Sequence, residues 1–213
     1  MEYTGILPLY YNADAEICFE VIKACYNGGL RAFEFTNRGD FAHEVFSELN
    51  KRVISDYPDM ILGTGSVVDA PTAAIYMQLG SNFIVSPSFH EDIAEICNLR
   101  KVLWMPGCGS VTEISRAEKY GAEVIKIFPG TQVGGPGFIK AVTAPKPWTR
   151  IMPTGGVEPT EDNLSKWFLS GAYCVGMGSK LITREIIENR DFLTLERSVK
   201  NAVEIVKKIR NNK

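Results

Sequence analysis

Short apolar runs alternate with longer amphipathic segments from one end of the chain to the other. The apolar runs are rich in β-branched and bulky residues, which predicts buried strands, and the segments between them repeat apolar residues at helical spacing. The expected strands cover residues 6–11, 32–36, 60–66, 83–88, 102–106, 123–129, 150–155 and 173–179. The expected helices cover residues 15–27, 41–56, 70–79, 91–99, 111–120, 137–143, 160–169 and 193–209.

A weak internal repeat supports this order. In CYNGGLRAFEFT, MQLGSNFIVSPS, EKYGAEVIKIFP and FLSGAYCVGMGS, a helix end is followed by glycine and then at once by a strand. Glycine suits the left-handed C-cap of a helix. Strict alternation of strand and helix predicts parallel strands, either in an open doubly wound sheet or in a closed barrel. Eight such units in 213 residues favour an α/β fold of one domain, a (β/α)8 TIM barrel over residues 1–213.

Composition and charge exclude several classes of protein. The 23 basic and 25 acidic residues give a net charge of −2, so the chain lacks the basic excess that nucleic acids and membrane surfaces attract. The five cysteines are scattered, which predicts reduced core residues rather than disulfides or a zinc site. His43 and His90 have no partners at metal-ligand spacing. The first residues show no signal peptide or membrane span, so we expect a cytoplasmic protein.

Two charged residues interrupt expected strands. Glu34 lies between two phenylalanines in AFEFTNR, and Lys126 lies between two isoleucines in EVIKIFP. Alternation of side chains along a strand would turn both charges into the barrel, where an unpaired charge is costly. They could form a structural ion pair. They could also react, because desolvation favours the neutral lysine amine that attacks a ketone, and a nearby carboxylate can move protons on the Schiff base that results.

Other polar residues gather at the expected C-terminal ends of strands, where barrel enzymes place their active sites. Arg38 follows the second strand and suits a substrate carboxylate, although it could also be a solvated loop residue. Gly155 and Gly156 follow the seventh strand, and Gly178 and Ser179 follow the eighth. Such loops often bind phosphate through backbone N–H groups. Either glycine pair alone could instead serve only to form a tight turn.

With these residues in place, the chain resembles the 2-keto-3-deoxy-6-phosphogluconate (KDPG) and 4-hydroxy-2-oxoglutarate (KHG) aldolases, which are small class I (Schiff-base) aldolases. The strings FEFTNR, GTGSV, SPS, MPG, IKIFPG, PTGGV and VGMGS carry the resemblance, in the order of the family. It runs from about residue 6 to about residue 181.

The resemblance implies a role for each candidate residue. Lys126 would form the Schiff base and Glu34 would be the general acid and base. The implied substrate-binding residues are Arg38 and Ser66 at the pyruvate carboxylate, the pocket walls Pro87 and Phe128, and Thr154, and the implied phosphate-binding residues are Gly155, Gly156, Gly178 and Ser179. The implied reaction is reversible cleavage of KDPG to pyruvate and D-glyceraldehyde 3-phosphate, with cleavage of KHG to pyruvate and glyoxylate as a second activity. No metal or cofactor is implied, and the implied assembly is a homotrimer.

Some residues depart from the family pattern and leave alternatives open. Ser66 stands where the family usually has Thr, Tyr10 or Tyr11 lies where many members have Arg, and Lys180 lies where a neutral residue is common. One alternative is an aldolase for the galactonate epimer, although Arg38 after EFTN favours the gluconate type. The others are a phospho-sugar isomerase or epimerase that uses Glu34 as a base without a Schiff base, and a non-catalytic barrel that binds phospho-sugars.

Overall fold

Parallel strands and helices alternate along the chain in the computed structural model, which describes residues 4–212. The strands are β1 (Ile6–Tyr10), β2 (Ala32–Thr36), β3 (Ile61–Gly65), β4 (Phe83–Val85), β5 (Leu103–Met105), β6 (Gly107–Cys108), β7 (Ile125–Ile127), β8 (Ile151–Pro153) and β9 (Val175–Met177). The helices are α1 (Ala15–Asn27), α2 (Ala42–Asp56), α3 (Ala70–Gln78), α4 (Glu91–Arg100), α5 (Val111–Lys119), α6 (Gly135–Thr143), α7 (Glu161–Leu169), α8 (Arg184–Glu188) and α9 (Phe192–Asn211).

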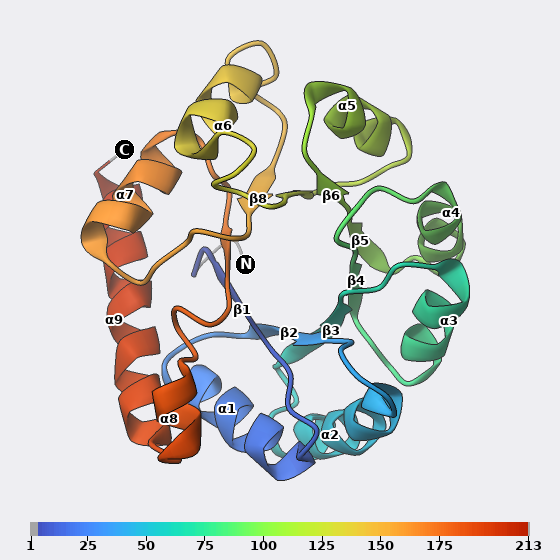
Figure 1. Cartoon of the computed structure of the whole chain (residues 1–213), viewed down its shortest axis with the longest axis vertical. Helices are drawn as coiled ribbons and strands as arrows, with labels where there is room; N and C mark the ends of the chain where they lie inside the picture. Colours follow the sequence, from blue (N-terminus) through green and yellow to red (C-terminus); the bar gives the residue numbers. More distant parts are fainter. Residues whose placement is uncertain (1–3, 213) are drawn as a thin grey trace.

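The strands pair into two parallel sheets. One sheet has the order β5-β4-β3-β2-β1-β9, and the other has the order β6-β7-β8. Figure 1 shows the strands in the centre of the molecule with the helices outside them. The prediction of a parallel α/β fold with strands covered by helices is confirmed, whereas the strand pairing is a curled six-stranded sheet and a separate three-stranded sheet rather than one continuous eight-stranded ladder.

The division between the sheets falls at Pro106. The sequence predicts one strand over residues 102–106, but β5 ends at Met105 and β6 begins at Gly107. Proline has no N–H group and so cannot donate to the strand ladder. At the other pair of sheet edges, an isolated bridge joins Thr154, which follows β8, to Gly176 in β9.

Side chains from both sheets meet in one buried inner cluster. Its members are Leu7, Ala32, Phe83, Val85, Met105, Val124, Met152 and Cys174. Phe33 and Phe35 instead belong to the cluster that the strands share with the helices, where the Phe35 ring lies 5.5 Å from the Phe46 ring of α2. Alternation in β2 therefore places Ala32 inside and the phenylalanines outside, as the sequence predicts, and Glu34 shares the inward face with Ala32.

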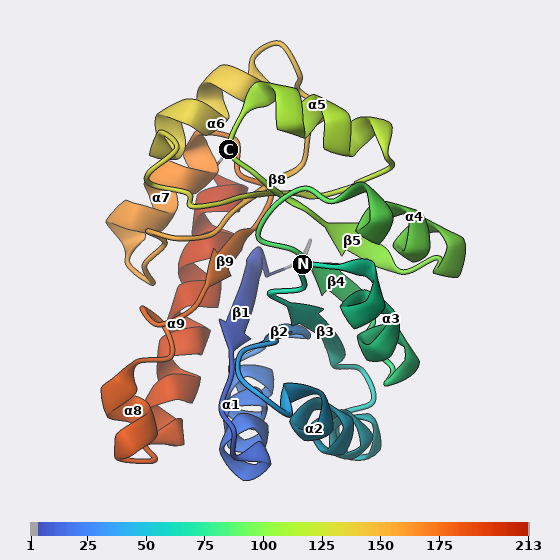
Figure 2. The ribbon, with the colours of Figure 1, turned by 45° about the vertical axis from the view of Figure 1, so that its right-hand side comes forward.

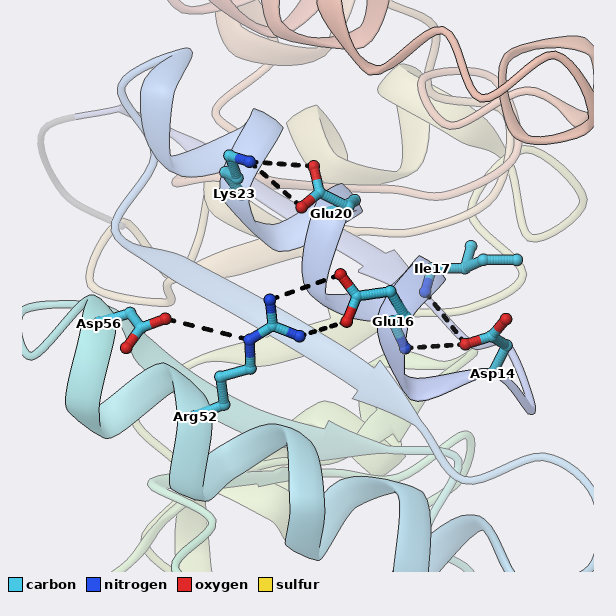
Figure 3. Close-up of polar contacts among 7 residues, drawn as sticks. All are labelled: Asp14, Glu16, Ile17, Glu20, Lys23, Arg52 and Asp56. Carbon is cyan, nitrogen blue, oxygen red and sulfur yellow. Dashed lines mark hydrogen bonds and ion pairs between the residues drawn. The ribbon is translucent and has the colours of Figure 1, made fainter.

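The helical layer is held by apolar packing and by polar contacts at the surface. The long helix α9 packs against α1 and α7, as Figures 1 and 2 show. Asp14 caps α1 by accepting hydrogen bonds from the backbone N–H groups of Glu16 and Ile17 at 2.8 and 3.4 Å. Arg52 of α2 pairs with Glu16 (Figure 3). Its Cζ atom lies 3.4 Å from the centre of the Phe19 ring.

Two elements differ from those that the sequence predicts. The strand β6 arises because Pro106 splits the expected fifth strand. The helix α8 has five residues and begins after Thr183, whose side chain accepts a hydrogen bond from the N–H group of Ile186. The five cysteines are buried and free, which confirms the prediction that they are core residues. No helix within residues 4–212 combines the length and the apolar content that crossing a membrane requires.

Candidate active site

A cavity of about 670 Å³ opens at the C-terminal ends of the strands. Its walls include all of the residues singled out from the sequence: Glu34, Arg38, Ser66, Pro87, Lys126, Phe128, Thr154, Gly155, Gly156, Gly178 and Ser179. These residues come from both sheets and from positions spread over about two thirds of the chain. The fold thus brings the whole predicted set to one cavity, whereas the part that each residue plays there is a separate question.

Glu34 lies on β2 and is only 1% exposed. The neighbouring strand β3 makes room for its carboxyl with Gly65, which pairs with Thr36. A Cβ atom on Gly65 would lie 1.7 Å from Glu34 Oε1, far inside any permitted contact. The second glycine of GTGSV, Gly65, is therefore required by the carboxyl that packs against it.

Burial sets the protonation behaviour of Glu34. Loss of water around the carboxyl raises its pKa, and the positive charges of Lys126 and Arg38 act in the opposite direction with smaller effect. The desolvation of a charged carboxylate is the largest of these effects because the group lies inside the protein. A carboxyl whose pKa is raised in this way is suited to act as a general acid and base.

Two buried side-chain polar atoms in the described part of the chain have no hydrogen-bond partner: Glu34 Oε2 and Thr154 Oγ1. Buried polar groups in proteins are nearly always satisfied, so each exception needs an explanation. Both atoms belong to residues that line the same cavity. A polar ligand in this cavity would supply the missing partners.

Lys126 lies on β7 in the smaller sheet and is 5% exposed. Its backbone N–H donates to the carbonyl of Pro106 at 2.9 Å, which fixes the strand beside the β5–β6 break. Its Nζ lies 5.1 Å from the centre of the Phe128 ring. The mostly buried amine of Lys126 therefore faces the cavity. It lies close enough to Glu34 to influence the pKa of that carboxyl.

The carboxylate end of the predicted site lies on the loops after β2 and β3. Asn37 holds the first loop, because its backbone N–H donates to the Gly65 carbonyl at 2.8 Å and its side chain accepts a hydrogen bond from the Tyr76 hydroxyl at 2.8 Å. Arg38 follows and is exposed at the cavity wall. Ser66 adopts a positive φ of 59°, which turns the chain directly after β3. Backbone strain of this kind is often found at functional sites.

The glycine-rich loops after β8 and β9 form the other end of the cavity. Gly155 and Gly156 have φ values of 94° and 80°, in the region that side chains other than glycine rarely enter. Asn163 and Trp167 of α7 hold this loop by donating hydrogen bonds to the Gly156 carbonyl. Gly178 and Ser179 face it from the end of β9. This arrangement exposes backbone beside a helix N-terminus, which suits an anion.

Several residues that line the cavity were not predicted from the sequence. Arg184, Ile187 and Glu188 of α8 line the cavity, because this short helix lies at its edge. The threonine before REIIE is an N-cap signal that could have indicated the helix, but five residues give too little periodicity to detect. Tyr10, Tyr11, Ser66 and Lys180 also line the cavity, which places the three departures from the family pattern at its wall.

Nothing in the described chain assembles a metal-binding cluster of three or more His, Cys, Asp or Glu side chains. Cys108 is the last residue of β6 and is buried, and burial raises the pKa of its thiol to about 12. A thiol in that state is a poor nucleophile. The ionisable groups that can act on a ligand in this cavity are therefore the buried pair Glu34 and Lys126 and the charged residues at its edge.

Comparisons with known proteins agree on one family. The family model described as "Aldolase: KDPG and KHG aldolase" matches residues 1–198. The 2-dehydro-3-deoxy-phosphogluconate aldolases of Pseudoalteromonas atlantica and Pseudomonas aeruginosa are 31% and 32% identical to this chain; each alignment covers 93% of this chain, and 89% and 88% of the respective relatives. A KDPG aldolase structure from Legionella pneumophila, with pyruvate captured as a covalent carbinolamine, superposes with a TM-score of 0.85 at 23% identity and covers 94% of this chain and 95% of its own. That likeness shows the fold.

The electrostatics of Glu34 lead to a testable prediction. The Glu34 carboxyl should titrate above the ordinary glutamate pKa, and the substitution Lys126→Met should raise its pKa further, because Lys126 supplies a charge that favours the ionised form. A carbon-13 NMR titration of the Glu34 carboxyl in both proteins measures this. A pKa that falls or stays unchanged in Lys126→Met would contradict the electrostatic coupling between the two residues.

Proposed function

The chain belongs to the KDPG and KHG aldolase family, and we propose that it is a class I aldolase that cleaves KDPG to pyruvate and D-glyceraldehyde 3-phosphate through a Schiff base on Lys126. Members of this family are lyases. One observation carries the proposal for this chain: the cavity that holds a buried lysine also holds the two buried polar atoms without partners, on Glu34 and Thr154. The names of the two relatives support the substrate.

Binding would orient the substrate along the cavity. The carboxylate of the keto acid pairs with Arg38, whose planar guanidinium can donate two parallel hydrogen bonds, and with the Ser66 hydroxyl. Pro87 and Phe128 hold the three-carbon pyruvyl part between apolar walls. This places the keto carbon near Lys126 Nζ, and the Thr154 hydroxyl gains a polar partner.

Covalent chemistry begins at the ketone. The neutral amine of Lys126 attacks C2 to form a carbinolamine, and the protonated Glu34 carboxyl donates a proton to its hydroxyl group, which leaves as water. The products are a protonated Schiff base on Lys126 and an ionised Glu34. Apolar surroundings favour this step because they exclude water that would hydrolyse the Schiff base. The positive iminium then withdraws electrons from C3.

Carbon–carbon cleavage follows. Glu34 accepts the proton of the C4 hydroxyl, either directly or through a water molecule, and the bond between C3 and C4 breaks. The electron pair of that bond moves to C3 and neutralises the iminium as an enamine, while C4 becomes the aldehyde of glyceraldehyde 3-phosphate. Glu34 returns its proton to C3, and water hydrolyses the Schiff base to give pyruvate and free Lys126.

The phosphate of the substrate would bind at the opposite end of the cavity. Backbone N–H groups of Gly155, Gly156 and Gly178, together with the Ser179 hydroxyl, are the donors that we assign to it. The N-terminus of α7 adds a partial positive charge. Cleavage of KHG, which lacks a phosphate, would use the same Lys126 and Glu34, so we propose it as a second activity. No metal or cofactor takes part in these steps.

The fold and assembly also enter the proposal. We propose that residues 1–213 form a single domain in which the two sheets close into a (β/α)8 barrel. The shared inner cluster, the bridge from Thr154 to Gly176, and the hydrogen bond from Lys126 N to Pro106 O support closure. We further expect a homotrimer in the cytoplasm. Exposed apolar side chains such as Phe41, the N-cap residue of α2, and Ile75 of α3 support an assembly.

Trapping with pyruvate tests the Schiff base. Borohydride reduction in the presence of pyruvate should attach a stable pyruvyl group to the peptide that contains Lys126, because reduction of the imine makes the bond permanent. Mass spectrometry of a digest measures the adduct. The variant Lys140→Met, which removes an exposed lysine on α6, should be labelled like the wild type. An unlabelled Lys126 peptide in the wild type would favour an isomerase or epimerase that uses Glu34 alone.

The substitution Gly65→Ala tests the position of Glu34. The new Cβ would displace the carboxyl, because it falls 1.7 Å from Oε1, and kcat/KM for KDPG should fall by about 100-fold or more. Steady-state kinetics on protein shown by circular dichroism to be folded measures the effect. The matched control is Gly137→Ala in α6, where a Cβ meets no atom within 4 Å and kcat/KM should not change. An unchanged kcat/KM in folded Gly65→Ala would remove Glu34 from the chemistry.

A further inference from the structure

We propose that Lys180 makes the enzyme selective for substrates with a phosphate at the end remote from the ketone, by leaving an ion pair with Glu158 and pairing with the phosphate. The inference rests on the proposed aldolase function and adds a specificity residue to it. Lys180 lines the cavity, and its Nζ lies 3.1 Å from Glu158 Oε1.

Lys180 lies in a tight turn that β9 leads into. The backbone N–H groups of Leu181 and Ile182 both donate to the carbonyl of Gly178, at 2.9 and 3.0 Å. This turn fixes the backbone of Ser179 and Lys180 at the edge of the cavity. The long lysine side chain can therefore change partners while its backbone stays in place.

Glu158 lies on the facing loop, two residues after Gly156. Its backbone N–H donates to Asn163 Oδ1 at 3.0 Å, and Asn163 Nδ2 donates to the Gly156 carbonyl, so one side chain of α7 fixes both ends of this short segment. The ion pair thus joins the two loops that carry the glycines assigned to phosphate. A phosphate bound between these loops would lie within the range of the Lys180 side chain.

The pair with Glu158 is easy to break. The side chains of Lys180 and Glu158 are 63% and 41% exposed, and exposed ion pairs contribute little to stability because water and salt screen them. A phosphate dianion offers more charge and more acceptor oxygens than one carboxylate. A change of partner by Lys180, from Glu158 to the substrate phosphate, should therefore favour binding of a phosphorylated substrate. A substrate without phosphate leaves the ion pair between Lys180 and Glu158 intact.

Arg184 is the other cation on this side of the cavity, and its contacts differ. It pairs with Glu188 one turn later on the same helix, at 2.6 Å, and its side chain is 90% exposed. That pair does not connect the glycine loops. The geometry therefore assigns the selective role to Lys180.

The test compares two substrates and two variants. Lys180→Met should lower kcat/KM for KDPG about tenfold, as expected for loss of a charge-assisted hydrogen bond, and should leave kcat/KM for unphosphorylated 2-keto-3-deoxygluconate unchanged. Glu158→Gln should keep or raise kcat/KM for KDPG, because Lys180 then has no competing partner. A merely structural ion pair predicts that both variants lower kcat/KM for both substrates alike, and that result would overturn the proposal.

A matched control and a binding measurement separate the possible failures. Lys166→Met removes a lysine that pairs with Asp162 on α7 outside the cavity, and it should leave both kcat/KM values unchanged. Inorganic phosphate should raise the melting temperature of the wild type and of Glu158→Gln more than that of Lys180→Met. A wild type that cleaves neither substrate contradicts the proposed function, and the phosphate-induced shift then decides on Lys180 alone. Equal shifts, or no shift, in the three proteins would overturn the proposal for Lys180.

Discussion

Burial of the Glu34 carboxyl in the interior, within electrostatic reach of the buried Lys126, is the constraint on which the site depends. An ionised carboxylate that leaves water loses much of its hydration free energy. Either nearby positive charge must compensate this loss, or the carboxylate must take up a proton. The positive charges of Lys126 and Arg38 compensate part of the lost hydration free energy. The uncompensated part raises the pKa of Glu34. The strand β3 adapts to the same group, because only glycine at position 65 leaves space for the carboxyl. Burial of such a group lowers the stability of the fold, which favours a functional role for Glu34 over a purely structural one.

Much of the interior could be predicted from the sequence. Alternation in AFEFT places Glu34 on the inward face because successive side chains of a strand point to opposite sides, and the two outward phenylalanines confirm it by packing with the helices. The cavity residues could be predicted because parallel strands bring their C-terminal ends to one side of the fold. These are local rules applied to one repeated unit.

The remaining features depend on contacts between distant segments. The break at Pro106 divides the strand ladder in two, although the strand pattern runs through it. The helix α8 is too short to be recognised by periodicity, and the ion pair of Lys180 joins two loops that are separated by a helix and a strand. A sequence pattern does not identify such partners. They determine which end of the cavity carries charge, and therefore which substrates we expect it to prefer.

The central claim is that Lys126 and Glu34 act together on a keto acid, and exchange of the methyl protons of pyruvate tests it most directly. In deuterated water the wild type should replace these protons with deuterium, because the enamine on Lys126 gains and loses a proton at C3 through Glu34. Proton NMR should show the methyl signal disappearing with the wild type, persisting with Lys126→Met, and decaying about 100-fold more slowly or worse with Glu34→Gln. A methyl signal that persists with the wild type, or that Lys126→Met removes equally fast, would contradict the claim.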